Sequence, residues 1–175
     1  MIPIAIHHLS YGPYEDNFFY LHWHYEFEFI VVLEWAVLYT VEEQEYCVTA
    51  GEGLFVHSNK LHAARAYNGM PCEACVVLFH PSLFGENKQG TAYSKFVYPI
   101  LNGSLIFEKH LKAKQWQQSV IERIIEIDAI RNENVSENEL ILKSKLFEIW
   151  HLCFSNSITE ASHRRDRKNY KLERM

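Results

Sequence analysis

The sequence predicts a mainly β domain, built as an antiparallel sandwich or barrel, followed by C-terminal helices. All seven glycines and all five prolines lie at or before Gly103. In that part, short segments rich in Val, Phe, Tyr and Thr alternate with turn signals such as "TAGEG" and "YNGMP", a spacing typical of antiparallel β structure. After Gly103 the apolar residues recur at helical spacing instead, so we expect strands to give way to helices there.

Turn signals separate the expected strands. The strands lie near residues 3–8, 17–22, 26–34, 36–42, 44–49, 53–57, 62–67, 73–80 and 104–107. The segment "TAYSKFVYPIL", residues 91–101, is expected as a short helix that ends at Pro99, because proline disrupts a helix interior.

Two helices are expected after the β part. In the first, one side is apolar and carries Trp116, Val120, Ile124 and Ile127, flanked by Ile121 and Ile125. Charged side chains fall on the other side. The second helix is expected to begin at "SENE", where Ser136 and Glu139 can form a capping box, and to run to about Phe154.

The second helix is apolar along two rows. One row contains Leu142, Leu146, Ile149, Trp150 and Cys153, and the other contains Leu140, Phe147 and Phe154. A helix that is apolar on two sides needs two partners. We expect one row to pack inside the domain and the other to contact a second copy of the protein; the alternative is that both rows are internal.

Length and composition exclude several classes of protein. A chain of 175 residues, 48% apolar and 22% charged, is sufficient for one globular domain with an extension. No apolar run is long enough to cross a bilayer, because Glu28, Glu34 and Glu42 interrupt the most hydrophobic region. The first ten residues lack an export signal. We therefore expect a cytoplasmic protein without a membrane partner.

The four cysteines are too few for a disulfide scaffold in a chain of this size. Only Cys72 and Cys75 have a spacing that resembles a metal motif. Residues three apart in a strand point to opposite faces, so these thiols are expected to diverge and to serve as small apolar side chains.

The net charge of −5 is unevenly distributed. Residues 156–175 carry six Lys or Arg against three acids, a net charge of +3, whereas residues 1–155 carry eleven against nineteen, a net charge of −8. An acidic body is a poor match for a phosphate backbone, and the basic tail is too short to read DNA by itself.

The stretch "LHWHYEFEFIVVLE", residues 21–34, alternates ionisable and aromatic side chains. If it forms one strand, one face carries His22, His24, Glu26, Glu28 and Ile30, and the other carries Trp23, Tyr25, Phe27, Phe29 and Val31. The aromatic face must be covered. A half-buried row of imidazoles and carboxylates is costly unless its members pair or bind something, which predicts an interior cavity.

A third imidazole can join this row from another strand. The segment "AGEGLFVHSNKLHA" provides a glycine turn, a short strand, a second turn and then His62. His22, His24, Glu28 and His62 would suit a divalent metal with open coordination positions. They would also suit a pocket that binds a ligand through hydrogen bonds, or an internal polar cluster whose members satisfy one another.

These residues carry a resemblance to the two motifs of the cupin barrel. "HWHYEFE" followed by "GEGLFVHSNKLH" matches the motifs, with His62 as the last imidazole. The chain departs from the pattern at three positions. His57 stands where proline is expected, and Asn59 and Trp35 stand where glycines are expected.

A longer resemblance runs from about Tyr20 to Met175. "HWHYEFEFIVVLE", "YCVTAGEGLFVHSNKLHAARA", a helix pair containing "LFEIWHL" and a linker ending "YKLERM" are together similar to the N-terminal effector-binding and dimerisation region of AraC-type transcription regulators. In such regulators a region with two helix-turn-helix units follows, and this chain lacks it.

The resemblance implies a cupin-like double-stranded β-helix barrel over residues 1–110, a helical dimerisation unit over 111–155 and a linker over 156–175. It implies that a small-molecule effector, such as a sugar, binds inside the barrel at His22, His24, Glu28 and His62. It further implies a homodimer through the C-terminal helices and DNA contact only through the missing region. No cofactor is required on this interpretation, and residues 1–16 are a candidate N-terminal arm.

The alternative interpretation is a metal-dependent cupin enzyme, such as an isomerase or dioxygenase, with a divalent metal at the same four residues. No phosphate loop or nucleophile motif supports other catalysis, and we expect no enzyme.

Smaller predictions concern the neighbours of the four residues. Ala64 and Ala66 should leave room beside His62, and Arg65 should point outward. Tyr39 and Tyr20 are expected in the aromatic core, and the alternative is that they edge the cavity. The remaining histidines, which show no partner spacing, are expected to be ordinary surface or core residues: His7, His8, His80, His110, His151 and His163.

Overall fold

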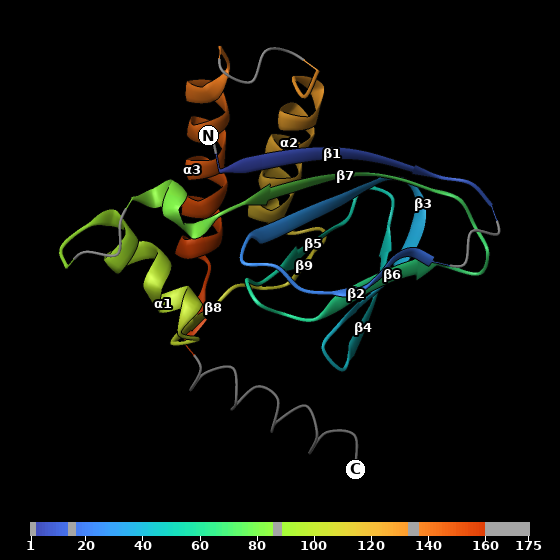
Figure 1. Ribbon diagram of the computed structural model, residues 1–175, viewed down its shortest axis with the longest axis horizontal. Coiled ribbons are helices and arrows are strands. Elements are labelled where there is room, and N and C mark those ends of the chain that lie inside the picture. Colours follow the sequence, from blue (N-terminus) through green and yellow to red (C-terminus); the bar gives the residue numbers. More distant parts are fainter. Residues whose placement is uncertain (1–2, 14–16, 86–88, 133–136, 160–175) are drawn as a thin grey trace.

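The computed structural model describes residues 3–13, 17–85, 89–132 and 137–159. Its strands are β1 (Ile4–Tyr11), β2 (Asn17–His22), β3 (Phe27–Val41), β4 (Gln44–Thr49), β5 (Gly53–Val56), β6 (His62–Ala66), β7 (Cys72–Phe79), β8 (Leu105–Ile106), β9 (His110–Leu111) and β10 (Ile158–Thr159). The short strands β9 and β10 were not expected, and the others lie close to the expected positions. The two main helices are α2 (Gln115–Ala129) and α3 (Glu139–Ser155). Figure 1 shows the strands on one side of this helix pair.

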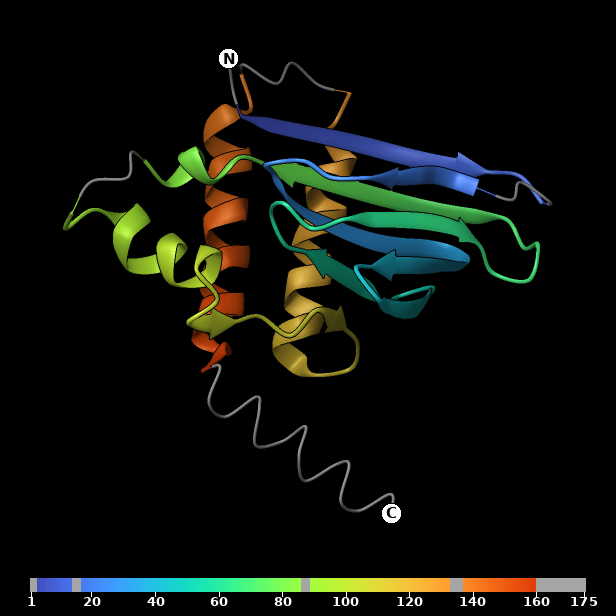
Figure 2. The same ribbon diagram turned by 60° about the horizontal axis from the view of Figure 1, so that its bottom comes forward.

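Two facing layers of strands share β3. One layer has the order β1-β7-β3-β5-β9, and in the other β6 lies between β2 and β3, and β4 pairs with β3 on its own. The first half of β3 pairs with β5 and β7, and its second half, from Ala36 on, pairs with β4 and β6. This strand therefore joins both layers, and Figure 2 shows them stacked. The arrangement is the double-stranded β-helix barrel followed by helices that the sequence predicts.

The bend in β3 occurs at Trp35. Two strands were expected on either side of it, which is wrong, because β3 continues from Phe27 to Val41. The register against β7 shifts between Val32 and Glu34, and Trp35 has a φ of 66°. A bulge with a left-handed residue bends a strand without ending its pairing.

Both departures from glycine in the cupin pattern keep a left-handed backbone. Asn59 has a φ of 60°, close to that of Trp35. Asn adopts this conformation readily, whereas a large side chain such as Trp does so at a cost. Trp35 is 51% exposed and lies after the half of β3 that is buried on both faces.

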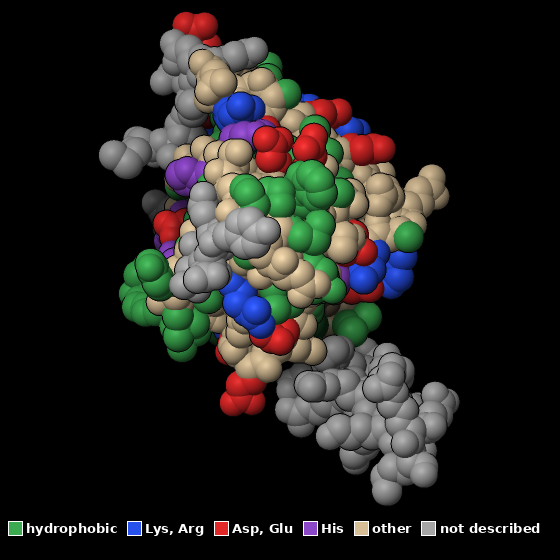
Figure 3. Space-filling view, turned by 90° about the vertical axis from the view of Figure 1, so that its right-hand side faces the viewer, with side chains coloured by type: hydrophobic (Ala, Val, Ile, Leu, Met, Phe, Trp, Pro, Cys, Tyr) green, Lys and Arg blue, Asp and Glu red, His purple; other side chains and the backbone are tan. Residues whose placement is uncertain are grey.

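Figure 3 shows one end of the molecule, where hydrophobic side chains gather near acidic ones.

Apolar side chains form two cores, one on each face of β3. Phe27, Phe29 and Val31 pack toward α2 and α3, where the ring centroids of Phe27 and Trp150 are 4.8 Å apart. Ile30 and Val32 lie in the barrel interior. This explains why the first six residues of β3 are all buried.

Cys72 belongs to the interior core and Cys75 to the helix-facing core, so the two thiols diverge, as predicted. Burial raises the pKa of Cys72 to about 11 and that of Cys75 to about 12. Thiols with pKa values this high are protonated near pH 7 and are poor nucleophiles.

One prediction about a helix end is wrong. Residues 93–101 form a π-helical turn, Tyr93–Val97, that leads into α1, Tyr98–Leu101. Pro99 lies in the first turn of α1, where its missing N–H costs nothing, and it does not end the segment. The second main helix, α3, begins at Glu139, within the expected "SENE". The capping box stays a prediction, because Ser136 lies outside the described residues.

The two rows of α3 have different surroundings. All five residues of the first row are buried, as predicted. In the second row Leu140 is 81% exposed and Phe147 is 44% exposed, so within this chain the alternative of two internal rows is wrong. What contacts the second row stays a prediction, as does the division at residues 110 and 155. Across the described ranges, no helix has the length and apolar character needed to span a membrane.

The left-handed backbone at residue 35 makes a testable prediction. Trp35→Gly and Trp35→Ala both remove the indole, so their difference reports the backbone conformation. We expect the glycine variant to be more stable by about 1 kcal/mol, because an alanine Cβ is strained at this φ. Chemical denaturation of both variants measures the difference.

The matched control is Glu45, an exposed residue of β4. There Glu45→Ala should be at least as stable as Glu45→Gly, because extended backbone gives glycine no advantage. The prediction would be contradicted if the glycine variant were no more stable than the alanine variant at residue 35, as is expected at residue 45.

Candidate functional site

Four ionisable side chains lie close together at the barrel, where Glu28 and His62 are buried, His24 is half-buried and His22 is exposed. His22 ends β2, His24 lies in the connection to β3, Glu28 lies in β3, and His62 begins β6. His22 and His62 are paired across the β2–β6 ladder, with ring centroids 4.3 Å apart. The ring centroid of His24 lies 4.9 Å from that of His62. The structure thus brings together the four residues named from the sequence. Their role in binding stays a prediction.

The reason for this grouping differs from the expected one. Residues 21–34 do not form one strand, because β2 ends at His22 and β3 begins at Phe27. Trp23 and Tyr25 lie between them and are 52% and 59% exposed, so the prediction that they are covered is wrong. The alternation of side chains between the two faces of a strand therefore applies only from Phe27 onward, where β3 begins.

Backbone carbonyls orient all three imidazoles in the same way. The Nδ1 atoms of His22, His24 and His62 lie 2.8, 3.1 and 2.8 Å from the carbonyl oxygens of Tyr20, Glu26 and Lys60. A ring nitrogen that faces a carbonyl carries the hydrogen. This arrangement leaves the second nitrogen of each ring for other contacts, and in His24 and His62 that nitrogen, Nε2, lies beside Glu28.

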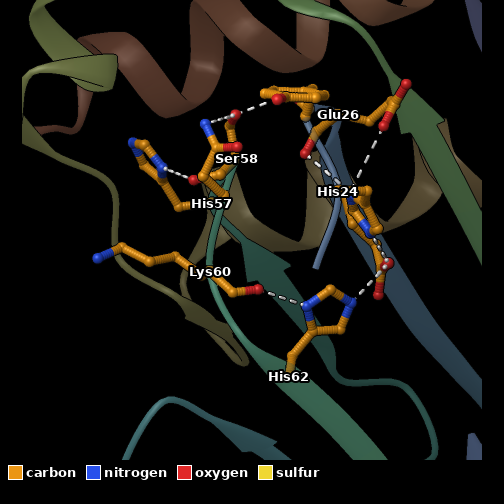
Figure 4. Close-up of polar contacts among 9 residues, drawn as sticks. His24, Glu26, His57, Ser58, Lys60 and His62 are labelled. Carbon is orange, nitrogen blue, oxygen red and sulfur yellow. Dashed lines mark hydrogen bonds and ion pairs between the residues drawn. The ribbon is translucent and has the colours of Figure 1, made fainter. Parts of the chain in front are cut away.

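Glu28 is the centre of the cluster and is 4% exposed. Its Oε2 lies 3.2 Å from Nε2 of His24 and 3.5 Å from Nε2 of His62, and the hydroxyl of Tyr39 donates to Oε1. Figure 4 shows the rings of His24 and His62 directed toward the same carboxylate.

The electrostatics of the cluster follow from these contacts. Burial alone would raise the pKa of Glu28, but the imidazoles of His24 and His62 and the hydroxyl of Tyr39 lower it to about 2. The hydrogen bond to Glu28 raises the pKa of His24, against the effect of burial. Burial and the nearby Glu28 raise the pKa of Tyr39 well above its ordinary value. Glu28 is therefore an anion at neutral pH, and Tyr39 is a hydrogen-bond donor to it.

His62 contributes a polar atom that the described part of the chain leaves unsatisfied. The residue is fully buried, and its Nε2 has no hydrogen-bond partner. One nitrogen from each of His22, His24 and His62 lies within 4.8 Å of the others. Three imidazoles with a carboxylate beside them are a donor set that first-row divalent metals accept, so these residues fit a metal.

A cavity of about 230 Å³ lies beside the cluster. His22, Glu28 and Tyr39 line one part of it, and the rest is lined by His7, Leu9, Phe19, Val76 and Leu78. Most of its wall is therefore apolar, and its polar groups are concentrated at the four-residue cluster.

The neighbours of His62 lie largely as predicted. Ala64 and Ala66 are buried in the barrel interior on the same side of β6 as His62. Arg65 points outward, and its NH2 lies 3.1 Å from Oε1 of Glu45. His57, which stands where the cupin pattern has proline, has Nε2 2.9 Å from the carbonyl oxygen of Ile100 and so connects the β5–β6 turn to α1.

Sequence reasoning missed His7 and did not foresee the contact that Tyr39 makes. The core was the expected place of Tyr39, and the alternative at the cavity edge is the better description, because Tyr39 lines the cavity and its hydroxyl contacts Glu28. The sequence did contain a signal. Tyr39 lies two residues from Val37 and from Val41 and so shares their interior face, where a buried hydroxyl needs a hydrogen-bond partner. Tyr20 is 79% exposed, so its placement in the core is wrong. His163 lies outside the described residues.

The lowered pKa of Glu28 predicts acid sensitivity in EDTA-treated protein. Its folded pKa, about 2, is below the ordinary value of 4.5, so the ionised group stabilises the fold above pH 4.5 and this contribution is lost as the pH falls toward 2. We expect the wild type to lose about 3 kcal/mol more stability over this range than Glu28→Gln. Urea denaturation at a series of pH values measures this.

Glu34→Gln removes an exposed carboxylate and is the control. It should follow the pH profile of the wild type. Parallel profiles for Glu28→Gln and wild type would contradict a lowered pKa at Glu28.

Comparisons with known proteins cover most of the chain. Residues 5–149 match the family model of the AraC-like ligand binding domain. A curated relative, described as an uncharacterized HTH-type transcriptional regulator of Bacillus subtilis (strain 168), is 23% identical over 150 residues, which are 85% of this chain and 50% of the relative. The chain thus spans about half the length of that protein.

Solved structures of low identity are also similar. An RmlC-like cupin family protein from Methanocaldococcus jannaschii is 18% identical, over 44% of this chain and 70% of that chain, with a TM-score of 0.40. A protein of unknown function from Streptococcus pyogenes is 16% identical, over 46% and 68% of the two chains, with a TM-score of 0.42. With the family model matching residues 5–149, the chain belongs to the family of AraC-like ligand binding domains.

Proposed function

We propose that this chain is the effector-sensing and dimerisation part of a bacterial AraC-type transcription regulator, which binds a small molecule inside the barrel. Family membership and the HTH-type regulator matched over half its length support this proposal. DNA contact would then belong to a region outside this chain, and the protein would act in the cytoplasm. The chain would not be an enzyme.

The observation that carries the proposal is the buried Nε2 of His62, which lies at ion-pair distance, 3.5 Å, from Oε2 of Glu28 but makes no hydrogen bond among the described residues. Leaving a buried polar atom unpaired costs about 1–3 kcal/mol. A ligand that donates a hydrogen bond to this atom would recover that cost. The protein interior thus favours a guest with donor groups.

The cavity wall indicates the chemistry of such a guest. Hydroxyl groups could donate to the imidazole of His22, beside His62, while carbon atoms contact Leu9, Val76 and Leu78. A sugar combines hydroxyl donors with apolar C–H faces, which supports a sugar as the effector. Binding would act by linkage, because a guest shifts the protein toward the arrangement for which it has the higher affinity.

The homodimer in this proposal uses the second row of α3. Leu140, Phe147 and Phe154 are seven residues apart, and the first two are exposed. A groove of about 440 Å³ lies next to this row and is lined by aromatic side chains, including Phe84 and Phe96. Exposed apolar rows at heptad spacing are typical of helix pairing between chains.

A metal-dependent cupin enzyme is the second candidate, favoured by the three converging imidazoles. His22, His24, Glu28 and His62 would hold Fe, Mn, Ni or Zn. Such a metal would supply a Lewis acid beside the cavity. The carbonyls that fix each Nδ1 would then orient the ligands.

A ligand screen by thermal unfolding distinguishes the two candidates. In EDTA, an effector at one hundred times its dissociation constant should add about 2.7 kcal/mol, or roughly 5–10 °C in Tm. His62→Phe should abolish this shift, because it removes the accepting nitrogen. Arg65→Gln, which changes the outward-facing neighbour on β6, should retain it.

Metal analysis of untagged protein completes the comparison. Stoichiometric metal that is lost in Glu28→Ala and His62→Ala would favour the enzyme. Folded, metal-free protein that is stabilised by an organic compound would favour the regulator.

Substitution of Phe147 tests the dimer. Phe147→Glu places a charge in the exposed row, and we expect the dimer dissociation constant to rise at least about tenfold, equivalent to 1.4 kcal/mol. Ile125→Glu changes an exposed apolar residue of α2 and should leave association unchanged. Sedimentation velocity measures both variants. A wild-type protein that stays monomeric at high concentration would contradict the proposed dimer.

A further inference from the structure

Strand β1 contacts the cavity with one face and the helices with the other. His7 and Leu9 line the cavity. Ile4 and Ile6, which have the opposite parity, pack on the helix-facing core. Successive side chains of a strand point to opposite faces, so β1 separates the candidate binding site from the helical part by a single layer of backbone.

His8 lies on the helix-facing side and contacts α2. Its Nδ1 lies 2.9 Å from Oδ2 of Asp128, which is 6% exposed. The NH1 atom of Arg131 lies 3.1 Å from the same Oδ2 and donates to the carbonyl of Asp128 at 3.0 Å. This group, which we call the β1–α2 latch, consists of His8, Asp128 and Arg131.

Asp128 is in an unfavourable position for helix stability alone. It lies in the last turn of α2, where the helix dipole repels a negative charge. It is buried, and its Oδ1 has no partner within the described residues. A buried carboxylate at this end of a helix requires compensation from cations or donors. Arg131 supplies part of this compensation from three residues further along the chain. His8 adds to it from β1, and is 120 residues away from Asp128 in sequence.

β1 is also an edge strand of its layer. Within the described residues its one ladder partner is β7. An edge strand can shift by disturbing one ladder, whereas a central strand must disturb two. A displacement of His7 or Leu9 can therefore move His8 at a small cost in free energy.

We propose that β1 transmits occupancy of the barrel cavity to α2 through the β1–α2 latch. This inference rests on the proposed function, for which it names the route of regulation. A guest that presses on His7 and Leu9 displaces β1 relative to β7. His8 moves with the strand and loosens or tightens its contact with Asp128. α2 packs against α3, which carries the exposed row proposed for dimerisation.

The experiment fills the cavity without an effector. Leu78 of β7 lines the cavity and is paired with Ala5 of β1, so Leu78→Trp places an indole in the cavity beside β1. Hydrogen–deuterium exchange measured by mass spectrometry reports β1 and the last turns of α2 separately. We expect exchange to change in both, by about threefold in α2, the size typical of altering one partly exposed ion pair.

His8→Ala combined with Leu78→Trp should retain the response in β1 and lose it in α2. Ser10→Ala, an exposed change on the same face of the same strand, is the matched control. Combined with Leu78→Trp it should retain both responses. Thermal melts and circular dichroism of every variant confirm folding.

Three results overturn the proposal. In the first, Leu78→Trp still changes hydrogen exchange in α2 when His8→Ala is present. In the second, Leu78→Trp leaves exchange in α2 unchanged although the latch is intact. In the third, Leu78→Trp leaves exchange in β1 unchanged. Because no effector is used, such a failure is distinct from a failure of the ligand screen or of the dimer test.

Discussion

The buried carboxylate of Glu28 is the constraint on which the rest of the structure depends. An anion that is 4% exposed in an apolar barrel is costly unless several donors meet it. Tyr39 comes from the other half of the same strand, His24 from the preceding turn and His62 from β6. Their convergence requires that β3 bend and that β6 pair in one register. A shift of one residue in either strand would direct these donors to the outer face.

The same strand determines how the site relates to the helices. Glu28 faces the barrel interior, and its neighbours Phe27 and Phe29 face α2 and α3. Because the two cores share this strand, packing of the helices fixes the position of the carboxylate. The interior cluster and the helical part are therefore mechanically close, although α3 begins nearly one hundred residues after β3 ends.

Much of the fold could be predicted because its signals are local. Alternation and turn residues located most strands, and the spacing from Gly51 to His62 identified the third imidazole. The turn at residues 23–26 was not predictable, since "HWHYEFE" satisfies the strand pattern throughout. The bend at Trp35 was not predictable either, because tryptophan usually avoids the left-handed φ that it adopts here. Contacts between distant residues, such as Tyr39 with Glu28 and His8 with Asp128, leave no spacing to detect.

The orientation of the imidazoles limits what can occupy the site. Each Nδ1 is engaged by a backbone carbonyl, so rotating a ring to present its other nitrogen would break a hydrogen bond worth about 1 kcal/mol. The fixed rings therefore offer Nε2 alone, and a guest must accept that geometry. A metal uses all three nitrogens at once, whereas an organic donor needs only the one that is buried in His62. Because His24 is already engaged with Glu28, an organic donor leaves the existing ion pair intact and a metal must compete with it.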